Sequence, residues 1–388
     1  MIKVVAFDLD TLTNKNGVTF KEQYQLALSE YISAQINTDV QFEHLISGLV
    51  SSILPDIVLV ADRFEASISR ALKIPAEKTA ALLKTFYENL FPQLREFVQL
   101  INSDDAKFIE LLRIRDYGIV IVTDPIYPEA IINYRLQWAG IPVNSENCAL
   151  VTHSSNMHFL KNDPAFYVEI AARVGVEPDE VLFVGEASST SSASAIVGLR
   201  GSLVTPTDSN CFSLSELSRK VVESNWLDEF HVTTLSPAMI EPELRGNMGA
   251  LVGILATGKP IHWHQHPDPN EWSPIQIVCH LLESESATQL KRLKRILGED
   301  NPFLINPTPP EGAKAIPCDD DAHQVLARFI KARQDTIHWL SSLTQNDWNR
   351  PARHSIFGPT SLLEMAHFTA QHDRLHINQL CQTLGRCI

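Results

Sequence analysis

The sequence predicts two domains in tandem: an α/β domain with a doubly wound parallel sheet and a helical cap, then an all-α four-helix bundle. Up to about residue 210, short β-branched apolar runs alternate with helical patterns, which is typical of a parallel sheet covered by helices. After residue 230 no convincing strand pattern appears, and four long patterns with helical spacing indicate a bundle. A chain of 388 residues is also too long for one ordinary hydrophobic core.

The α/β domain is expected at residues 1–210. Its strands are expected at four apolar runs, residues 2–7, 118–122, 180–184 and 202–204. Its helices are expected between these runs, at several patterns within 20–115 and at about 128–138 and 164–174. The helices of about 14–100 fall between the first two strands. They should form a cap over the carboxyl ends of the strands, where open α/β sheets bind their ligands.

The bundle is expected at residues 233–388, after a linker at 211–232. Its four helices are expected at about 237–257, 273–297, 320–343 and 361–384. Ser273 and Ser361 are each followed three residues later by Gln or Glu, which is the capping-box signal for a helix start. Residues 298–319 contain five prolines and should form a long crossover on the surface.

Composition excludes several classes of protein. The formal net charge is −14 without a basic block, which argues against nucleic acid as a partner. No apolar stretch approaches the roughly 18 residues of a membrane span, and the N-terminal run is too short and too acidic for a signal peptide. The six cysteines form no C-x-x-C pair and are expected to be reduced thiols. We therefore expect a soluble, cytoplasmic protein.

Polar side chains collect where the predicted strands end. They are Asp8, Asp10, Thr123, Asp124 and Glu186. Asp8 and Asp10 are two residues apart, so their carboxylates should point to the same side. One such carboxylate can act as nucleophile and hold Mg²⁺ while the other works as acid and base. An acyl-phosphate intermediate would also need a lysine and a small hydroxyl to bind its oxygens.

Four motifs come in the order and approximate spacing of the haloacid-dehalogenase-like (HAD-like) phosphatases. They are Asp8-Leu9-Asp10, Val122-Thr123, Leu160-Lys161-Asn162-Asp163-Pro164-Ala165 and Val184-Gly185-Glu186. Residues 1 to about 210 therefore resemble that family. The resemblance implies that Asp8 is the nucleophile and Asp10 the acid/base. It also implies phosphate ligands, Thr123 and Lys161, and ligands for Mg²⁺, namely Asp8, Asp10 and Glu186.

The first and last of these motifs depart from the family pattern. The family usually has Asp-x-Asp-Gly-Thr-Leu, whereas this chain continues after Asp10 directly with Thr11-Leu12. The last motif usually has two aspartates. Here Glu186 takes the place of the first, and the second would fall near Ser191. A Mg²⁺ site with these changes is short of negative charge, so we expect an eroded phosphatase site.

The C-terminal region carries a candidate metal site. His372 and His376 are four residues apart, which puts both imidazoles on one face of the last helix. His280 lies near the start of the second bundle helix. Three histidines from two facing helices can bind a transition metal, Zn or Ni by preference, and leave positions open for water or substrate. On spacing alone, a solvated helix face stays the alternative.

Two segments resemble the DinB-like domains. Glu271-Trp272-Ser273-Pro274, followed by His280 and Glu283-Ser284-Glu285, is similar to their opening, and residues 372–380 are similar to their closing H-x-x-x-H helix. The match covers about 235–385. It implies a His-triad metal site at His280, His372 and His376 on an up-up-down-down bundle. Some relatives are metal-dependent thiol transferases or a thiol-dependent isomerase, and many have no known activity.

Three further sets of charged or metal-binding residue types in the C-terminal region are not expected to be metal ligands. Glu283 lies one turn after His280. It either supports a metal ligand or acts as a base, or it is a solvated charge on the helix surface. Asp373 adjoins a ligand in sequence but points about 100° away around the helix, so a salt bridge is expected. The tract of His262, His264 and His266 precedes a proline-rich turn and is interpreted as a surface loop.

Three hypotheses for function follow. The chain is a DinB-like metal-dependent transferase or hydrolase, a HAD-like hydrolase working through Asp8, or a non-catalytic two-module binding or regulatory protein. For the enzymes the partner is a small-molecule substrate, phosphorylated or thiol-containing, and neither nucleic acid nor membrane is expected. A homodimer is compatible with the sequence, which does not name the substrate.

Overall fold

The computed structural model describes residues 1–13, 19–50, 57–141, 148–185, 189–203, 216–219, 234–259, 262–306, 318 and 321–387. The chain divides into two units. The first holds Met1–Phe166, Asp179–Ala195 and Leu199–Val232. The second holds Tyr167–Pro178, Ile196–Gly198 and Thr233–Ile388. The domain limits expected at 210 and 233, with the linker between them, stay a prediction. No helix of the described residues is long and apolar enough to cross a membrane.

A parallel sheet forms the centre of the N-terminal region. Its strands are β1 (Val4–Asp8), β2 (Gly118–Val122), β3 (Leu150–Val151), β4 (Val181–Gly185) and β5 (Arg200–Leu203). Their order is β3-β2-β1-β4-β5, and all neighbours are parallel. Every residue of β1 is buried, as expected for the central strand of a covered sheet. The predicted doubly wound α/β class is confirmed, whereas the two-residue β3 was not expected.

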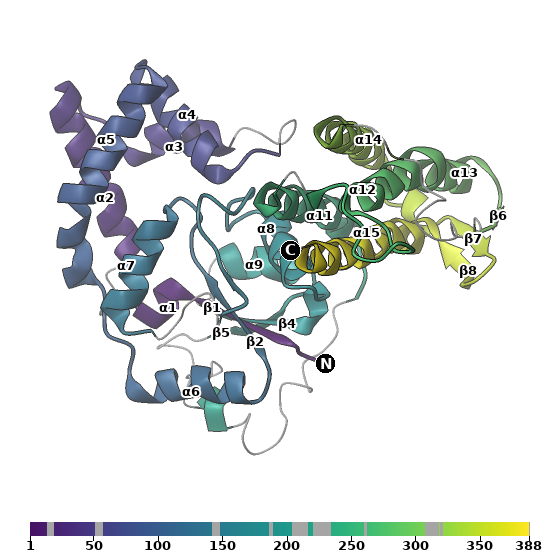
Figure 1. Ribbon diagram of the computed structural model, residues 1–388, viewed down its shortest axis with the longest axis horizontal. Coiled ribbons are helices and arrows are strands. Elements are labelled where there is room, and N and C mark those ends of the chain that lie inside the picture. Colours follow the sequence, from purple (N-terminus) through teal and green to yellow (C-terminus); the bar gives the residue numbers. More distant parts are fainter. Residues whose placement is uncertain are drawn as a thin grey trace. The chain divides into compact units, whose positions relative to one another are not determined.

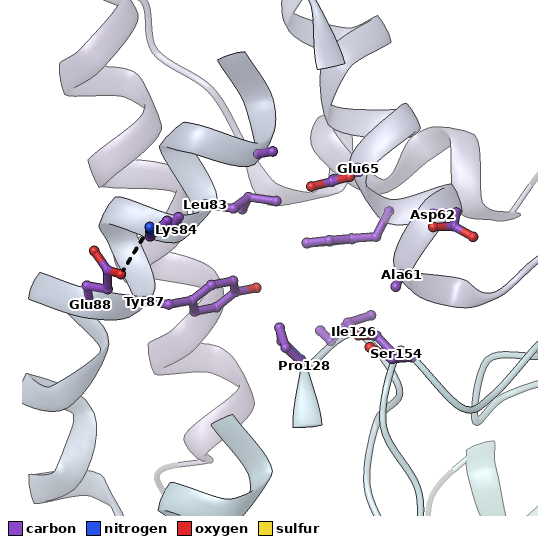
Figure 2. Close-up of a pocket in the computed structure, with 13 residues that line it drawn as sticks. Ala61, Asp62, Glu65, Leu83, Lys84, Tyr87, Glu88, Ile126, Pro128 and Ser154 are labelled. Carbon is purple, nitrogen blue, oxygen red and sulfur yellow. Dashed lines mark ion pairs between the residues drawn. The ribbon is translucent and has the colours of Figure 1, made fainter. Parts of the chain in front are cut away.

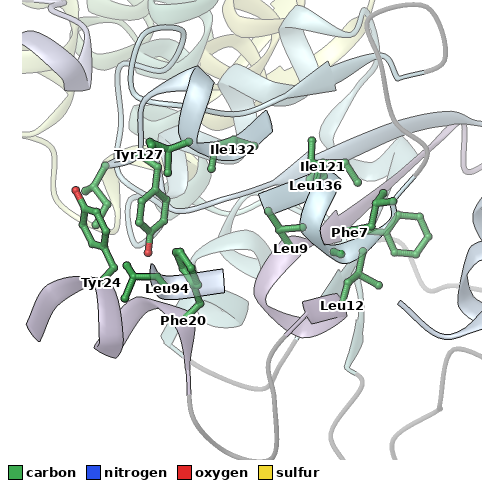
Figure 3. Close-up of a cluster of buried hydrophobic side chains, with 14 of the residues drawn as sticks. Phe7, Leu9, Leu12, Phe20, Tyr24, Leu94, Ile121, Tyr127, Ile132 and Leu136 are labelled. Carbon is green, nitrogen blue, oxygen red and sulfur yellow. The ribbon is translucent and has the colours of Figure 1, made fainter. Parts of the chain in front are cut away.

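Helices precede, connect and follow these strands (Figure 1). Between β1 and β2 come α1 (Leu9–Thr13), α2 (Phe20–Ile36), α3 (Phe42–Val50), α4 (Val60–Leu72), α5 (Ala76–Asn89), η1 (Phe91–Phe97) and α6 (Ser103–Ile114). Later come α7 (Glu129–Ala139), α8 (Pro164–Arg173), η2 (Pro178–Glu180) and α9 (Ser189–Ile196). One hydrophobic cluster joins α2 to the sheet layer. In it the rings of Tyr24 and Tyr127 lie 4.8 Å apart, and Phe7 lies further along (Figure 3).

The C-terminal unit is the expected helical bundle. Its helices are α11 (Pro237–Thr257), α12 (Pro274–Glu283), α13 (Leu290–Gly298), α14 (Ala322–Leu340) and α15 (Leu362–Arg386). Between α12 and α13 the chain forms a π-helical segment, η5 (Ser284–Gln289), so the second expected helix is continuous but changes its pitch in the middle. The capping box of Ser273 with Gln276 is present at the start of α12.

The expectation that no strand follows residue 230 is wrong. A small three-stranded sheet consists of β6 (Phe303–Leu304), β7 (Pro351–His354) and β8 (Gly358–Ser361), and η7 (Asp347–Asn349) precedes β7. β7 and β8 are antiparallel neighbours joined by a short turn, and Gly358, the first residue of β8, adopts a positive φ of 76°. These strands are two to four residues long, too short to show an alternating pattern in the sequence.

The expectation that all cysteines are reduced thiols is wrong for one pair. Cys279 of α12 forms a disulfide with Cys318, and their Cα atoms are 6.4 Å apart. The two residues are 39 positions apart in the chain, so no local cysteine motif indicates the pairing. Cys148, Cys381 and Cys387 are unpaired, and Cys211 lies outside the described residues.

Candidate functional site

The three predicted histidines come together in the bundle. His280 lies on α12, and His372 and His376 lie on α15. The helices α12 and α15 pack against each other (Figure 1). One ring nitrogen of each lies within 4.8 Å of the other two, and the Nε2 atoms of His280 and His372 are 3.3 Å apart. Two nitrogens bound to one tetrahedral ion at about 2.0–2.1 Å lie about 3.3 Å apart. The pair of His280 and His372 has this separation, and with the nitrogen of His376 the three donors form a group that could hold a transition-metal ion.

Local structure explains this convergence. The spacing of four places His372 and His376 one turn apart on α15, with ring centroids 4.6 Å apart. The indole of Trp272, just before α12, stacks on His376 with centroids 5.9 Å apart and contacts His280 at 5.0 Å. His376 Nδ1 is 2.8 Å from Gln379 Oε1. This acceptor requires a proton on Nδ1, which leaves the Nε2 lone pair directed away from Gln379.

The electrostatics of the triad favour neutral imidazoles. Burial, and then the proximity of the other two histidines, lowers the pKa of His280 to about 4. Burial, followed by the charges of His376 and Arg333, lowers the pKa of His372 to about 3. The pKa of His376 is also lowered, again mainly by burial. Neutral imidazole is the form that binds metal, so these side chains need lose no proton at neutral pH.

The other candidate residues of the bundle take different places. Glu283 is exposed on α12, in the manner of a solvated helix charge. Asp373 faces Arg333 of α14, and two of their N–O pairs are hydrogen bonded, one of them at 3.1 Å. His264 and His266 are exposed in the loop before α12 and His262 is half-buried. Among the described residues, the triad is the one cluster of three or more side chains with metal-ligand geometry.

The predicted carboxylates of the N-terminal unit lie at the carboxyl end of β1. Asp8 is the last residue of this strand, and its Oδ2 is 2.6 Å from the Nζ of Lys161, which is 153 residues away in the chain. Asp10 lies two residues later, in α1, and its backbone N–H donates to Asp8 Oδ1 over 3.1 Å. The structure thus brings together Asp8, Asp10 and Lys161. Their catalytic roles stay a prediction.

Arg135 of α7 is a site residue that the sequence analysis missed. Its side chain is fully buried, it donates to Asp10 Oδ1 over 2.5 Å, and its guanidinium lies 3.9 Å from the ring of Phe20. Burial by itself would raise the pKa of Asp10, but Arg135 and then Lys161 outweigh it and hold that pKa below its usual value. Asp10 is therefore a carboxylate in a fixed ion pair rather than a ready proton donor.

Two of the remaining predicted residues, Thr123 and Asp124, directly follow β2, the neighbour of β1 in the sheet. Thr123 is buried, and its hydroxyl donates to the carbonyl oxygen of Thr152 over 2.6 Å. The Oδ2 of Asp124 is 2.6 Å from Nζ of Lys21. Glu186 lies outside the described residues.

Among the predicted site residues that the structure describes, every carboxylate that could bind Mg²⁺ already forms an ion pair. The three acids Asp8, Asp10 and Asp124 are matched one to one by buried or half-buried cations, Lys161, Arg135 and Lys21. A divalent cation would add positive charge to a cluster in which three carboxylates and three cations already balance each other. The hypothesis of a magnesium site stays a prediction, and we derive no chemical step through it.

A separate cavity of about 430 Å³ lies in the N-terminal unit. Figure 2 shows Asp62 and Glu65 of α4 on one side and Tyr87 and the Lys84–Glu88 ion pair of α5 on the other. The Tyr87 hydroxyl is hydrogen bonded to the Tyr24 hydroxyl over 3.0 Å. The predicted site residues are not among those that line this cavity.

Comparison with known proteins gives one family match and several similar solved structures. Residues 247–380 match the model of the DinB superfamily. No curated protein sequence matches the chain. A 2-haloacid dehalogenase from Pseudomonas syringae pv. Tomato DC3000 is 19% identical, over 57% of this chain and 99% of its own, with a TM-score of 0.40. A HAD family enzyme from Bacteroides thetaiotaomicron, in complex with magnesium and inorganic phosphate, is 14% identical, over 54% of this chain and 98% of its own, with a TM-score of 0.33.

The C-terminal part has its own similar structure. YfiT from Bacillus subtilis, which has an unusual four-helix bundle topology, is 19% identical, over 38% of this chain and 87% of its own, with a TM-score of 0.32. The chain joins an N-terminal part built on a five-stranded parallel sheet to a C-terminal helical part, within which residues 247–380 match the DinB superfamily model.

Proposed function

We propose that this protein is a metal-dependent transferase or hydrolase whose chemistry takes place at His280, His372 and His376. One observation carries the proposal: the Nε2 atoms of His280 and His372 are 3.3 Å apart, the separation of two ligands on one tetrahedral ion. All three histidines fall within residues 247–380, which match the DinB superfamily. Three nitrogens leave at least one position of a tetrahedral ion for another ligand.

The chemistry follows from neutral donors in a half-buried setting. His280, His372 and His376 would hold a divalent transition metal, Zn or Ni by donor type, which when bound would supply Lewis acidity. Gln379 keeps the Nδ1 proton on His376 and so presents Nε2 as the ligand atom. Trp272 covers one side of the rings of His376 and His280 and limits access of water from that side. We infer a small-molecule substrate, phosphorylated or thiol-containing.

Metal analysis of the purified protein tests the proposal. We expect about one equivalent of Zn or Ni per chain, and a loss of at least tenfold in affinity in each of His280→Gln, His372→Gln and His376→Gln. The matched control is His338→Gln, on an exposed histidine of α14. A wild-type protein that binds no transition metal, or a His376→Gln variant that binds it as tightly as wild type, would overturn the proposal.

A second candidate function is phosphate-ester hydrolysis through Asp8. The pair of Asp8 Oδ2 and Lys161 Nζ, 2.6 Å apart at the end of the central strand, favours it. The ion pair of Asp10 with Arg135 opposes it, because a carboxylate held by a buried arginine is a poor general acid. We expect weak hydrolysis of p-nitrophenyl phosphate at best. Strong Mg²⁺-dependent hydrolysis that Asp8→Asn abolishes would establish this function instead.

A further inference from the structure

A buried ion network lies beside the histidine triad. Arg333 of α14, Asp373 of α15 and Glu285 of η5 are each at most 2% exposed. Both terminal nitrogens of Arg333 contact the Asp373 carboxylate, and one of them also lies 2.8 Å from Glu285 Oε2. The Thr336 hydroxyl, one turn further along α14, donates to Glu285 Oε1. One guanidinium thus contacts two carboxylates from two other helices.

These two carboxylates belong to the helices that carry the metal ligands. Asp373 directly follows His372, so a two-point contact with Asp373 fixes both the rotation and the height of α15 at the ligand. Glu285 comes five residues after His280. In an uninterrupted α-helix Glu285 would lie about 140° around the axis from His280. The wider turn of the π-helical segment reduces that angle, and π-helical segments are frequent at functional sites.

A second contact joins the same two helices. The Thr369 hydroxyl, one turn before His372, donates to Gln289 Oε1 over 3.3 Å, and Gln289 is the last residue of η5. Both residues are buried. These polar contacts therefore help to hold the ligand-bearing helices in register. In this set α14 supplies Arg333 and Thr336 but no metal ligand.

We propose that Arg333 is a positioning residue for the metal centre. By binding Asp373 and Glu285 at once, it sets the rotation of α15 at His372 and of the α12–η5 helix at His280, so that the three imidazoles face one point. The inference rests on the proposed function. It adds that the third helix, α14, determines metal affinity although none of its side chains touches the metal.

The experiment uses the full-length protein loaded with Co²⁺, whose visible spectrum reports coordination geometry. Arg333→Lys keeps the charge but removes the planar fork. The triple variant Glu285→Gln, Arg333→Met, Asp373→Asn keeps the shape and removes all three buried charges together, so that none is left unpaired. Lys331→Met is the control, on an exposed lysine of the same helix whose ion-pair partner is Asp335. Melting of the metal-free proteins verifies that each variant folds.

We expect Arg333→Lys and the triple variant each to fold, to lose about 10–100-fold in Co²⁺ affinity and to change the spectrum. Lys331→Met should match wild type in both measurements. If either folded Arg333 variant bound Co²⁺ within threefold of wild type and gave the same spectrum, the role of Arg333 would be purely structural and the inference overturned. A wild-type protein that binds no Co²⁺ would instead overturn the proposed function itself.

Discussion

At the scale of single residues, two buried arginines determine how the acidic groups of this protein behave. Arg135 holds Asp10 as a carboxylate in the N-terminal unit, and Arg333 joins Asp373 to Glu285 in the bundle. In both places the positive charge comes from the protein. The histidine triad differs from these sites because its three donors are neutral and bring no charge of their own. A metal is therefore easier to accommodate at the triad than at Asp8 and Asp10.

Arg135→Met should destabilise the N-terminal unit by about 3–5 kcal/mol, because it leaves the Asp10 carboxylate buried without its partner. The double variant Arg135→Met, Asp10→Asn should recover most of this loss, since it removes both charges. Urea unfolding at pH 7 measures the difference. Equal stability of the single and double variants would contradict an energetic role for this ion pair.

The triad predicts the pH dependence of the metal-free protein. The pKa values of His280 and His372 are about 4 and about 3, below the ordinary value of 6.5. Between these lowered values and 6.5, the unfolded state therefore binds more protons than the folded state. The free energy of unfolding should rise with pH through the window from about 4 to 6.5, and fall as the solution is acidified. Melting of the metal-free protein across this range measures the slope. His280→Asn should flatten it, and an unchanged slope would refute the assignment.

Some of these residues could be identified as site residues from the sequence, and others could not. His372 and His376 are four apart on one helix, so the spacing itself indicates a shared face. Arg135 and its partner Asp10 are 125 residues apart, and no local pattern marks a lone arginine in an otherwise ordinary helix. Arg333 is equally unmarked. Buried ion pairs between distant segments become visible only when the fold brings their elements together.

At the scale of elements, long periodic segments were predictable and short ones were not. The expected strand at 118–122 is β2, and the expected helix at about 237–257 is α11. β3 and β6 have two residues each, too few for any periodicity. The π-helical segment η5 was missed because the spacing of buried residues through it also fits an ordinary helix.

The start of α12 yields a prediction at this scale. Ser273→Ala removes the side-chain cap of the helix that carries His280 and should cost about 1 kcal/mol. The melting temperature of the bundle should fall by roughly 2–4 °C. Ser286→Ala, on an exposed serine of η5, is the matched control and should change it by less than about 1 °C. Equal shifts in the two variants would contradict the importance of the capping box.

At the scale of the whole molecule, the chain divides into two compact units. Buried hydrophobic side chains occur in each, for example Phe7 and Ile121 in the first unit and Leu244 and Ile277 in the second. Two compact units predict that each part unfolds as its own cooperative transition.

Metal should therefore stabilise one part alone. A ligand at 100 times its dissociation constant adds about 2.7 kcal/mol to the native state that binds it. For a bundle of this size, that corresponds to a rise of roughly 5–10 °C in its melting temperature. In calorimetry of the full chain we expect two transitions, of which only one moves when Zn²⁺ is added. His376→Gln should remove the shift, and Asp8→Asn should leave it intact. A shift of both transitions, or one that survives His376→Gln, would place the metal elsewhere in the chain.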